Sequence, residues 1–554
     1  MIKYKMPIPN IKNYIKTSCS KLVCILCMLC LCGCSTVPGL LVPEEASPPP
    51  SPPRELLRLA MPSNADTFHP LYANSSGMMD VLWLVFESLL TTDETGKLTA
   101  CLASTWSCAP SGNQTVWSLS LRKGVTWHDG SPFTADDVVY SFDQIKQGQM
   151  NVNTGGVFRN VLSAYRQNLD AVLSYRKVDE NTFEFTTQYA DYGALYQLDF
   201  PIVKANSFSS EQAQTNAPIG TGGYRVTSAQ LNVAMQLEAN QNWWKVQPTI
   251  RSVSVTAMES PSAVMQAFIL REIDALTSDL TTVSDLRASS DAKMTDYLTR
   301  QYVFIAPNCA NAVLSNVNVR KALQMGMDKT TIITQVYQNH AIAVDSPLYP
   351  FSYLHASQNV VVGSAAEISA LLADAGWNLR DGNGIYYYID DQHRKIELAF
   401  TLLVNENRFD TARQEVARML VAQWAKIGIK VELSLASWED YQKAINEKTF
   451  DLVLGSYQLS NALDIDFAFS SGSQKNINGV SSAGLDAQLT ALRNAASEES
   501  YFATWQALER EILDYVPYIS LFYLRNTLVV SNDLHYTLPA EKQAYRNVAL
   551  WRFE

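Results

Sequence analysis

Hydrophobic and polar side chains alternate most clearly between residues 114 and 121. Trp117, Leu119 and Leu121 fall on one side of an extended chain, whereas Ser118 and Ser120 fall on the other. A period of two is typical of a strand that buries one face. The pattern therefore predicts a half-buried strand at this point in the chain.

Two turns and a helix are predicted directly after this strand. The sequences Lys-Gly at 123–124 and His-Asp-Gly at 128–130 are typical of turns. Thr134 occupies an N-cap position ahead of Asp136 and Asp137, and carboxylates favour the positive end of a helix. The stretch therefore predicts a rigid strand–turn–helix scaffold, and nothing in it indicates catalysis.

Strands and helices alternate through much of the remaining chain, which indicates the α/β class. Apolar residues at helical spacing predict helices at 260–270, 368–377, 412–427, 438–445 and 485–515. Alternating or continuous apolar runs predict strands at 253–257, 302–309, 396–404, 429–435, 450–457 and 516–523.

The length and net charge of the chain further limit the kinds of protein to which it could belong. The chain has 554 residues, which is enough for two or three hydrophobic cores. Its net charge of -11 argues against a nucleic-acid-binding surface. Five lysines precede an uncharged run at 22–33, which is too short for a permanent membrane span and is typical of a signal-peptide core.

The end of that run, Leu31-Cys32-Gly33-Cys34, resembles the bacterial lipobox. The resemblance implies a signal peptide at 1–33 and a lipidated Cys34, followed by a proline-rich tether at 34–55. Two or more acyl chains would hold the protein on a bacterial membrane, in the periplasm or cell envelope. A cleaved signal with an incidental cysteine and an uncleaved anchor remain as alternatives.

Residues 106–140 also resemble the signature of the family 5 extracellular solute-binding proteins, the peptide- and nickel-binding lipoproteins of ABC importers. In that family a tryptophan-led strand ends in L-R-x-G-V-x-W/F-x-D-G-x-P-x-T-A-x-D-V. The matching residues here are Leu121, Arg122, Gly124, Val125, Trp127, Asp129, Gly130, Pro132, Thr134, Ala135, Asp137 and Val138.

Shorter matches follow along the chain. Residues 217–226 resemble the family's P-x-G-T-G-P-Y box, whose glycines are expected to supply the positive φ of a tight turn. Residues 271–275 fit its G-x-I-D-A turn, with Arg271 in place of the glycine. Arg320 lies in a segment that resembles the V-R-x-A-L pattern; it is either a carboxylate anchor for ligand or a structural ion pair.

The resemblance implies a two-lobed periplasmic-binding-protein fold of class II (cluster C), in the α/β class, with an extra domain on the first lobe. Lobe I is then expected at 56–78, 181–302 and 522–554, the extra domain at 79–180, and lobe II at 303–521. Two crossings, near 302–308 and 519–524, would let the lobes close on a ligand like a hinge.

Peptide-binding members hold an extended ligand by main-chain pairing. By resemblance, the two pairing edges are Asn64-Ala65-Asp66-Thr67 and Tyr457-Gln458-Leu459, with Trp438 and Tyr457 as pocket aromatics. Packing into the core is the alternative role for both aromatic side chains.

The chain departs from the peptide-binding pattern at Ser460, where these relatives place an aspartate that binds the ligand's amine. Asp464 is the nearest carboxylate that could take this role. If neither residue serves, the ligand is expected to be something other than an ordinary peptide.

The expected function is a monomeric binding lipoprotein that captures a small peptide and delivers it to ABC permease and ATPase subunits. The alternatives are a non-standard ligand (a cell-wall peptide, a glutathione-like peptide, a metal chelate or haem) and a binding-only sensor or chaperone. We expect no enzyme activity, cofactor or metal ligand set, because the six histidines are scattered and Ser174-Tyr175-Arg176-Lys177 lacks the partner motifs of penicillin-recognising enzymes. Cys101 and Cys108 are close enough in sequence to pair in an oxidising compartment, which would leave Cys309 unpaired.

Overall fold

A computed structural model describes residues 54–73, 75–147, 165, 169–208, 215–278, 292–355, 362–407, 411–459, 464–537 and 543–554. The expected signal peptide, Cys34 and most of the tether lie outside these ranges, and so does Ser460. None of the helices within them is long and apolar enough to cross a membrane.

The first lobe is built on a four-stranded sheet in the order β1-β10-β9-β8. Its strands are β1 (Leu56–Pro62), β8 (Tyr224–Gln230), β9 (Ala234–Ala239) and β10 (Ser252–Met258). β1 runs parallel to β10, and the other neighbours are antiparallel. α1 (Ser76–Leu82) packs against β1, and α5 (Pro261–Ile269) follows β10.

A second four-stranded sheet, in the order β4-β5-β7-β6, contains the strand predicted from the alternating pattern. Its strands are β4 (Ala103–Ser111), β5 (Gln114–Leu121), β6 (Val172–Asp179) and β7 (Thr182–Thr187), and α2 (Ala135–Gln147) packs on β6 and β7. Trp117, Leu119 and Leu121 are buried, as the alternation requires. The domain boundary expected at residue 180 falls between two paired strands of this sheet, so the sheet itself continues to Thr187.

The signature residues hold this part of the chain together through Asp137. Its buried carboxylate accepts hydrogen bonds from the indole Nε1 of Trp127 at 3.1 Å and from the main-chain N–H of Thr134 and Ala205 at 2.9 Å. Thr134 directly precedes α2, so the bond from its N–H is the return half of a capping box. The signature is therefore structural, as expected.

The glycine-rich box at 217–226 allows its main chain to lie close to the main chain of Leu84 and Val85. His128 accepts a hydrogen bond from Gly220 N and bonds to Gly222 O, which fixes the box beside the signature. A Cβ at Gly220 would lie 1.9 Å from the carbonyl oxygen of Val85. The predicted reason was wrong, because neither Gly220 nor Gly222 has a positive φ; the glycines serve to avoid this clash.

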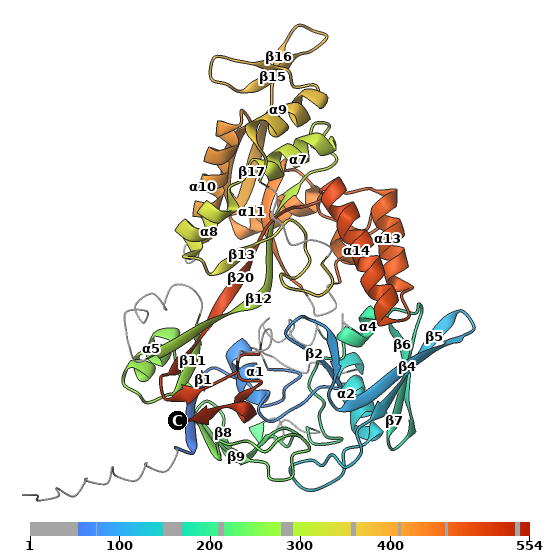
Figure 1. The fold of residues 1–554 in the computed structure, drawn as a ribbon, viewed down its shortest axis with the longest axis vertical. Coiled ribbons are helices and arrows are strands. Elements are labelled where there is room, and N and C mark those ends of the chain that lie inside the picture. The colour runs from blue at the N-terminus through green and yellow to red at the C-terminus, as the bar shows by residue number, and fades with distance from the viewer. Residues whose placement is uncertain are drawn as a thin grey trace, which may run out of the picture. The chain divides into compact units, whose positions relative to one another are not determined.

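A seven-stranded sheet joins the first lobe to the second, as Figure 1 shows for β12 and β20. Its main path is β11-β20-β12-β19-β17-β18, and β13 pairs with β20. The strands are β11 (Ala275–Ser278), β12 (Ala292–Pro307), β13 (Ala341–Ala343), β17 (Ala399–Asn405), β18 (Lys430–Ala436), β19 (Leu452–Gln458) and β20 (Ile519–Ser531).

The pairing of the two long strands of this sheet shifts register at two places. The β12–β20 register breaks between Leu298 and Tyr302, opposite Arg525 and Tyr523, and shifts again between Val303 and Phe304. The boundary expected at residue 302 lies inside β12 and the boundary expected at 521 lies inside β20. The first register break lies at residues 299–301 of β12, next to the crossing expected at 302–308.

Eight helices accompany the second-lobe strands in the described residues. They are α7 (Val317–Met325), α8 (Lys329–Tyr337), α9 (Ala365–Asp374), α10 (Thr411–Lys426), α11 (Trp438–Glu447), α12 (Asp466–Phe469), α13 (Ala483–Arg493) and α14 (Glu498–Tyr515). The helix expected over 485–515 is thus two helices. A small sheet of β14 (Leu379–Arg380), β15 (Tyr386–Ile389) and β16 (Lys395–Glu397) extends from this lobe.

Arg320 is a structural residue, although it forms no ion pair with any residue that the structure describes. It is completely buried and donates to the carbonyl oxygens of Leu314, Ser315, Tyr515 and Val516 at 2.6 to 2.9 Å. The last two carbonyls belong to the C-terminal end of α14, where a cation suits the negative end of a helix. The expected alternatives, a ligand anchor and a carboxylate pair, are both wrong.

Cys101 and Cys108 are free thiols. Cys108 lies in β4, which begins two residues after Cys101. An extended strand advances about 3.3 Å per residue, whereas a disulfide needs Cα atoms within about 7 Å of each other. The extended geometry of β4 therefore keeps the two cysteines apart.

The turn after α5 explains the missing glycine of the 271–275 segment. Arg271 is exposed and has φ +58°, in the left-handed region that the family's glycine would occupy without strain. The turn positions Asp274, a buried carboxylate that binds the side chains of Arg54 and Arg58 at 2.6 and 2.7 Å.

We predict that Arg271→Gly stabilises the protein by about 1 kcal/mol, because it removes the cost of a left-handed non-glycine residue. Thermal unfolding followed by circular dichroism checks this. Leu270→Gly is the matched control: Leu270 has an ordinary φ of -78°, so its replacement should lower the unfolding temperature. Equal destabilisation by both changes would contradict the strain argument.

Candidate functional site

Tyr457 lies in an aromatic cluster on β19. Its ring centroid is 4.6 Å from that of Phe304 and 5.0 Å from that of Phe467, and its hydroxyl is 3.4 Å from the hydroxyl of Tyr518. Burial in this cluster raises the pKa of Tyr457 to about 12. The side chain is half-buried, so packing accounts for much of its surface and contact with a ligand stays a prediction.

Trp438 does not pack into the core. It is the first residue of α11, its side chain is 59% exposed, and its ring stacks on Tyr441 at 5.6 Å. This exposure excludes core packing, one of the two roles expected for Trp438, and its contact with a ligand stays a prediction.

The two predicted pairing edges differ in how much main chain is available. The N–H and C=O of Ala65 are both bonded to the side-chain amide of Asn232, at 2.8 and 2.9 Å. Asn64 and Asp66 are exposed, whereas Thr67 is buried and accepts a hydrogen bond from His69 N. Pairing of a ligand with Ala65 would therefore require Asn232 to move.

The second predicted edge, at the end of β19, has more main chain available for pairing with a ligand. One side of Gln458 and Leu459 is used by β12, since Gln458 pairs with Gln301 and Leu459 N donates to Arg300 O. On the other side, the pairing with β17 ends at Val453 in the described residues. The end of β19 beyond that point has a strand neighbour on one side only, as addition of a ligand strand requires.

Asp464 lines a cavity of about 370 Å³ between segments of the two lobes, hereafter the acidic cavity. On the first-lobe side it is lined by β6, β7 and the segment around α4 (Gly193–Tyr196), including Asp170, Asp191 and Gln197. On the second-lobe side it is lined by α13, α14 and the start of α12, including Asp464, Asp466 and Arg493.

Hydrogen bonds hold the two walls of the acidic cavity together. Asp191 N donates to Arg493 O and Tyr192 N donates to Ala495 O, both at 2.8 Å. The hydroxyls of Tyr196 and Tyr353 are 2.8 Å apart. Because these contacts join the lobes, the cavity has its full lining only when the lobes are together.

In the acidic cavity, burial and neighbouring carboxylates raise the pKa values of Asp191 and Asp464. Burial and, as the second cause, the charge of Asp464 raise the pKa of Asp191 to about 6. Burial also raises the pKa of Asp464, with Asp466 as the second cause. Asp466 forms an ion pair with Arg493, the only cationic residue in the lining that is described.

Gln197 contributes a further acceptor to the acidic cavity. Its side chain is 8% exposed, and its Oε1 has no hydrogen-bond partner in the described structure. Together with Asp191 and Asp464, it makes a cavity rich in acceptors and negative charge. A group with several N–H donors and a positive charge would complement this lining.

Sequence reasoning identified Asp464 and missed Asp191, Gln197 and Arg493. These residues come from segments more than 250 positions apart in the chain and belong to no motif. Only the contact between the α4 region and α13 brings them together. No group of three or more potential metal ligands occurs among the residues that the structure describes.

The family model of the bacterial extracellular solute-binding proteins, family 5, matches residues 97–479. The chain belongs to this family. Its relatives include the oligopeptide-binding protein AppA of Bacillus subtilis, 23% identical over 496 residues, covering 87% of this chain and 89% of AppA. Heme-binding protein A of Haemophilus influenzae is 27% identical over 377 residues, covering 62% of this chain and 63% of that protein.

Solved structures show the same fold. A nickel ABC transporter protein of Bacillus halodurans superimposes with a TM-score of 0.74 at 18% identity, covering 90% of this chain and 100% of that one. The expected two-lobed α/β fold is thereby confirmed. Family 5 members are substrate-binding proteins of transporters and act outside the cytoplasm, and this chain shares that general function.

We predict that Asp191 titrates near pH 6 and that Asp464→Asn lowers its pKa. Removing a neighbouring like charge favours the ionised carboxylate, so the shift must be downward; burial, the larger cause, keeps the pKa above the usual range. Carboxyl ¹³C NMR of aspartate-labelled protein measures both values. A wild-type midpoint near 4, or one unchanged by the substitution, would contradict the assigned coupling.

Proposed function

We propose that this family 5 protein captures small peptides between its lobes and delivers them to an ABC permease, with Asp464 and Asp191 receiving the peptide's amine. The acceptor-rich acidic cavity carries this proposal. An α-ammonium group supplies one positive charge and three donors, which match two carboxylates and the free Oε1 of Gln197.

The proposed capture is a closure with no covalent chemistry. Asp191 and Asp464 come from different lobes and repel each other when both are ionised. A bound ammonium converts this repulsion into two attractions, so it stabilises the arrangement in which the lobes meet. The single-sided end of β19 supports main-chain pairing of the rest of the peptide.

Peptides are favoured by the ligand chemistry and by the relatives together. AppA, which aligns over most of both chains, is named an oligopeptide-binding protein. In this proposal, Asp464 binds the ligand's amine in place of the aspartate that peptide-binding relatives carry at the position of Ser460. We also propose that the protein acts as a monomer with its permease and ATPase partners, anchored in the cell envelope by lipid on Cys34.

Calorimetry with the tripeptide Ala-Ala-Ala and its N-acetyl form tests the amine site. Asp464→Asn should weaken binding of the free tripeptide about tenfold or more, since the charge pair with its amine is lost. Acetylation should weaken binding to the wild type but add little in the variant, because both changes remove the same interaction.

Glu415→Gln, on the exposed surface of α10, is the matched control and should leave both affinities unchanged. Below pH 6 the wild-type affinity should fall as Asp191 becomes protonated, since its pKa is raised to about 6. Equal affinity for the free and acetylated tripeptides in the wild type would exclude an amine site in the acidic cavity.

The lipid anchor has its own test. Replacing Cys34 with serine should release the exported protein from the membrane fraction, because no acyl chain can be attached. Fractionation followed by immunoblotting, with Cys309→Ser as the control, measures the effect. A Cys34→Ser protein that stays with membranes would indicate an uncleaved anchor instead.

A further inference from the structure

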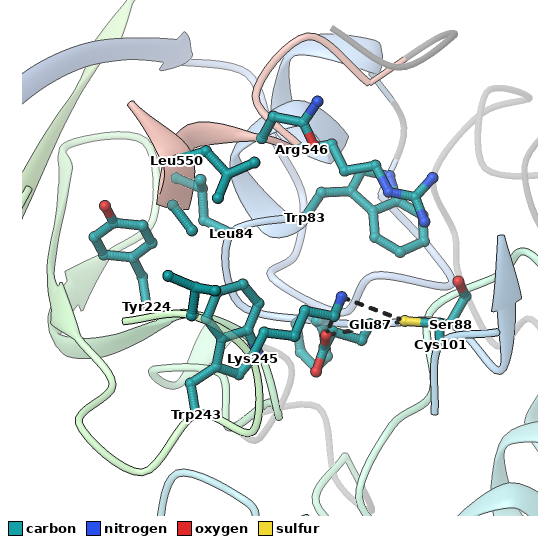
Figure 2. A pocket seen from close by; sticks show the side chains of 16 residues that line it. Trp83, Leu84, Glu87, Ser88, Cys101, Tyr224, Trp243, Lys245, Arg546 and Leu550 are labelled. Carbon is teal, nitrogen blue, oxygen red and sulfur yellow. Dashed lines mark hydrogen bonds and ion pairs between the residues drawn. The ribbon is translucent and has the colours of Figure 1, made fainter. Parts of the chain in front are cut away.

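A second cavity, of about 340 Å³, lies within the first lobe and shares no lining residue with the acidic cavity. Its lining comes from the end of α1 and the segment after it, the glycine box, the segment after β9, and the C-terminal segment near η2 (Val548–Leu550). Figure 2 shows its side chains. The charged residues among them are Glu87, Lys245 and Arg546, which leave one net positive charge.

Glu87 supplies the only carboxylate in the described lining of this cavity, and both of its oxygens bond to neighbouring side chains. Glu87 Oε2 accepts from the hydroxyl of Thr221 at 3.0 Å and from the indole of Trp244 at 2.9 Å. Its Oε1 lies 2.9 Å from the ammonium of Lys245, which also bonds to Cys101 Sγ at 3.7 Å (Figure 2). Glu87 and Lys245 thus neutralise each other.

Arg546 has no such partner. Within the described residues its guanidinium makes no ion pair and no hydrogen bond, although the side chain is partly buried. Burial lowers the pKa of Arg546, and the charges of Asp199 and Glu87 offset this effect only in part. Asp199 and Glu87 are the nearby carboxylates, and neither bonds to it.

Other features of the lining suit an anion with a flat apolar body. The indole Nε1 of Trp243 is a buried donor without a hydrogen-bond partner. The rings of Trp83 and Trp243 contribute aromatic surface, and Leu84 and Leu550 add apolar surface (Figure 2). In the described lining, the polar groups without a hydrogen-bond partner are the guanidinium of Arg546 and the Nε1 of Trp243. Both are donors, whereas the lining of the acidic cavity is rich in acceptors.

We infer that this first-lobe cavity binds an organic carboxylate, with Arg546 as its charge partner and the tryptophan rings against its body. A guanidinium presents parallel N–H groups that match the two oxygens of a carboxylate. The volume is adequate for a small ligand. The carboxylate belongs either to a separate organic acid or to the captured peptide; the site itself does not depend on the function proposed above.

Benzoate and its uncharged amide, benzamide, are suitable probes because they differ only in the anionic group. Calorimetry on the purified protein should show benzoate binding at least tenfold more tightly than benzamide. Arg546→Gln should lower benzoate affinity at least tenfold and leave benzamide unaffected, whereas Arg546→Lys should retain part of the preference.

Arg225→Gln is the matched control, because Arg225 is an exposed first-lobe arginine paired with Glu238 on β8 and β9. Equal affinity of the wild type for the two probes, or unchanged benzoate binding in Arg546→Gln, would overturn the inference. The comparison of benzoate with benzamide on the wild-type protein tests the inference even if the Arg546→Gln protein does not fold.

Competition identifies the source of the carboxylate. If Ala-Ala-Ala displaces benzoate and Arg546→Gln weakens this peptide but not its C-terminal amide, the carboxylate is the peptide's own. If peptide and benzoate bind together, the site holds a separate acid, and Asp464→Asn should leave benzoate affinity unchanged. Both results support a carboxylate site, and the second stands even if the peptide proposal fails.

Discussion

The pairing of β12 with β20 is the constraint on which the two-lobed arrangement depends. These strands are shared by the central sheet on both sides of the crossing, so the lobes are joined by hydrogen-bonded strands and not by a loose linker. The ladder resists separation, but its register is broken near Leu298 and Tyr302. A break in a ladder leaves main-chain dihedrals less restrained, so lobe motion should concentrate there. Contacts such as the hydrogen bond from Asp191 N to Arg493 O form a second connection between the lobes.

The two cavities differ in the sign of the charge that they contain. The acidic cavity combines Asp191 and Asp464, and the pKa of each carboxyl is raised by burial and by a neighbouring carboxylate. The first-lobe cavity keeps Arg546 with no carboxylate bonded to it among the described residues. Isolated buried charge is destabilising unless it is compensated. That both signs occur, each beside a space of ligand size, is better explained by binding than by packing.

The sequence predicted the scaffold well because scaffold signals are local. The alternation around Trp117 required a buried face, and Asp137 ahead of an apolar helix face required a helix start; both occur where they were expected. Its failures were also physical. The glycines at 220 and 222 were assigned to positive φ, whereas they relieve a clash with residues more than 130 positions away. Arg320 was assigned a carboxylate partner, whereas it bonds carbonyl groups at the end of α14.

The candidate site was less predictable because its members share no motif or period. Asp191 follows a strand and Arg546 lies near the C-terminus, and nothing in their neighbours distinguishes them from surface charges. The residues that identify the family, such as Trp127 and Asp137, are instead committed to hydrogen bonds within the scaffold. A side chain whose bonds are all satisfied inside the protein cannot also select a ligand. Members of one family can therefore keep these residues and bind different ligands, and ligand identity must be decided by the unsatisfied groups around the two cavities.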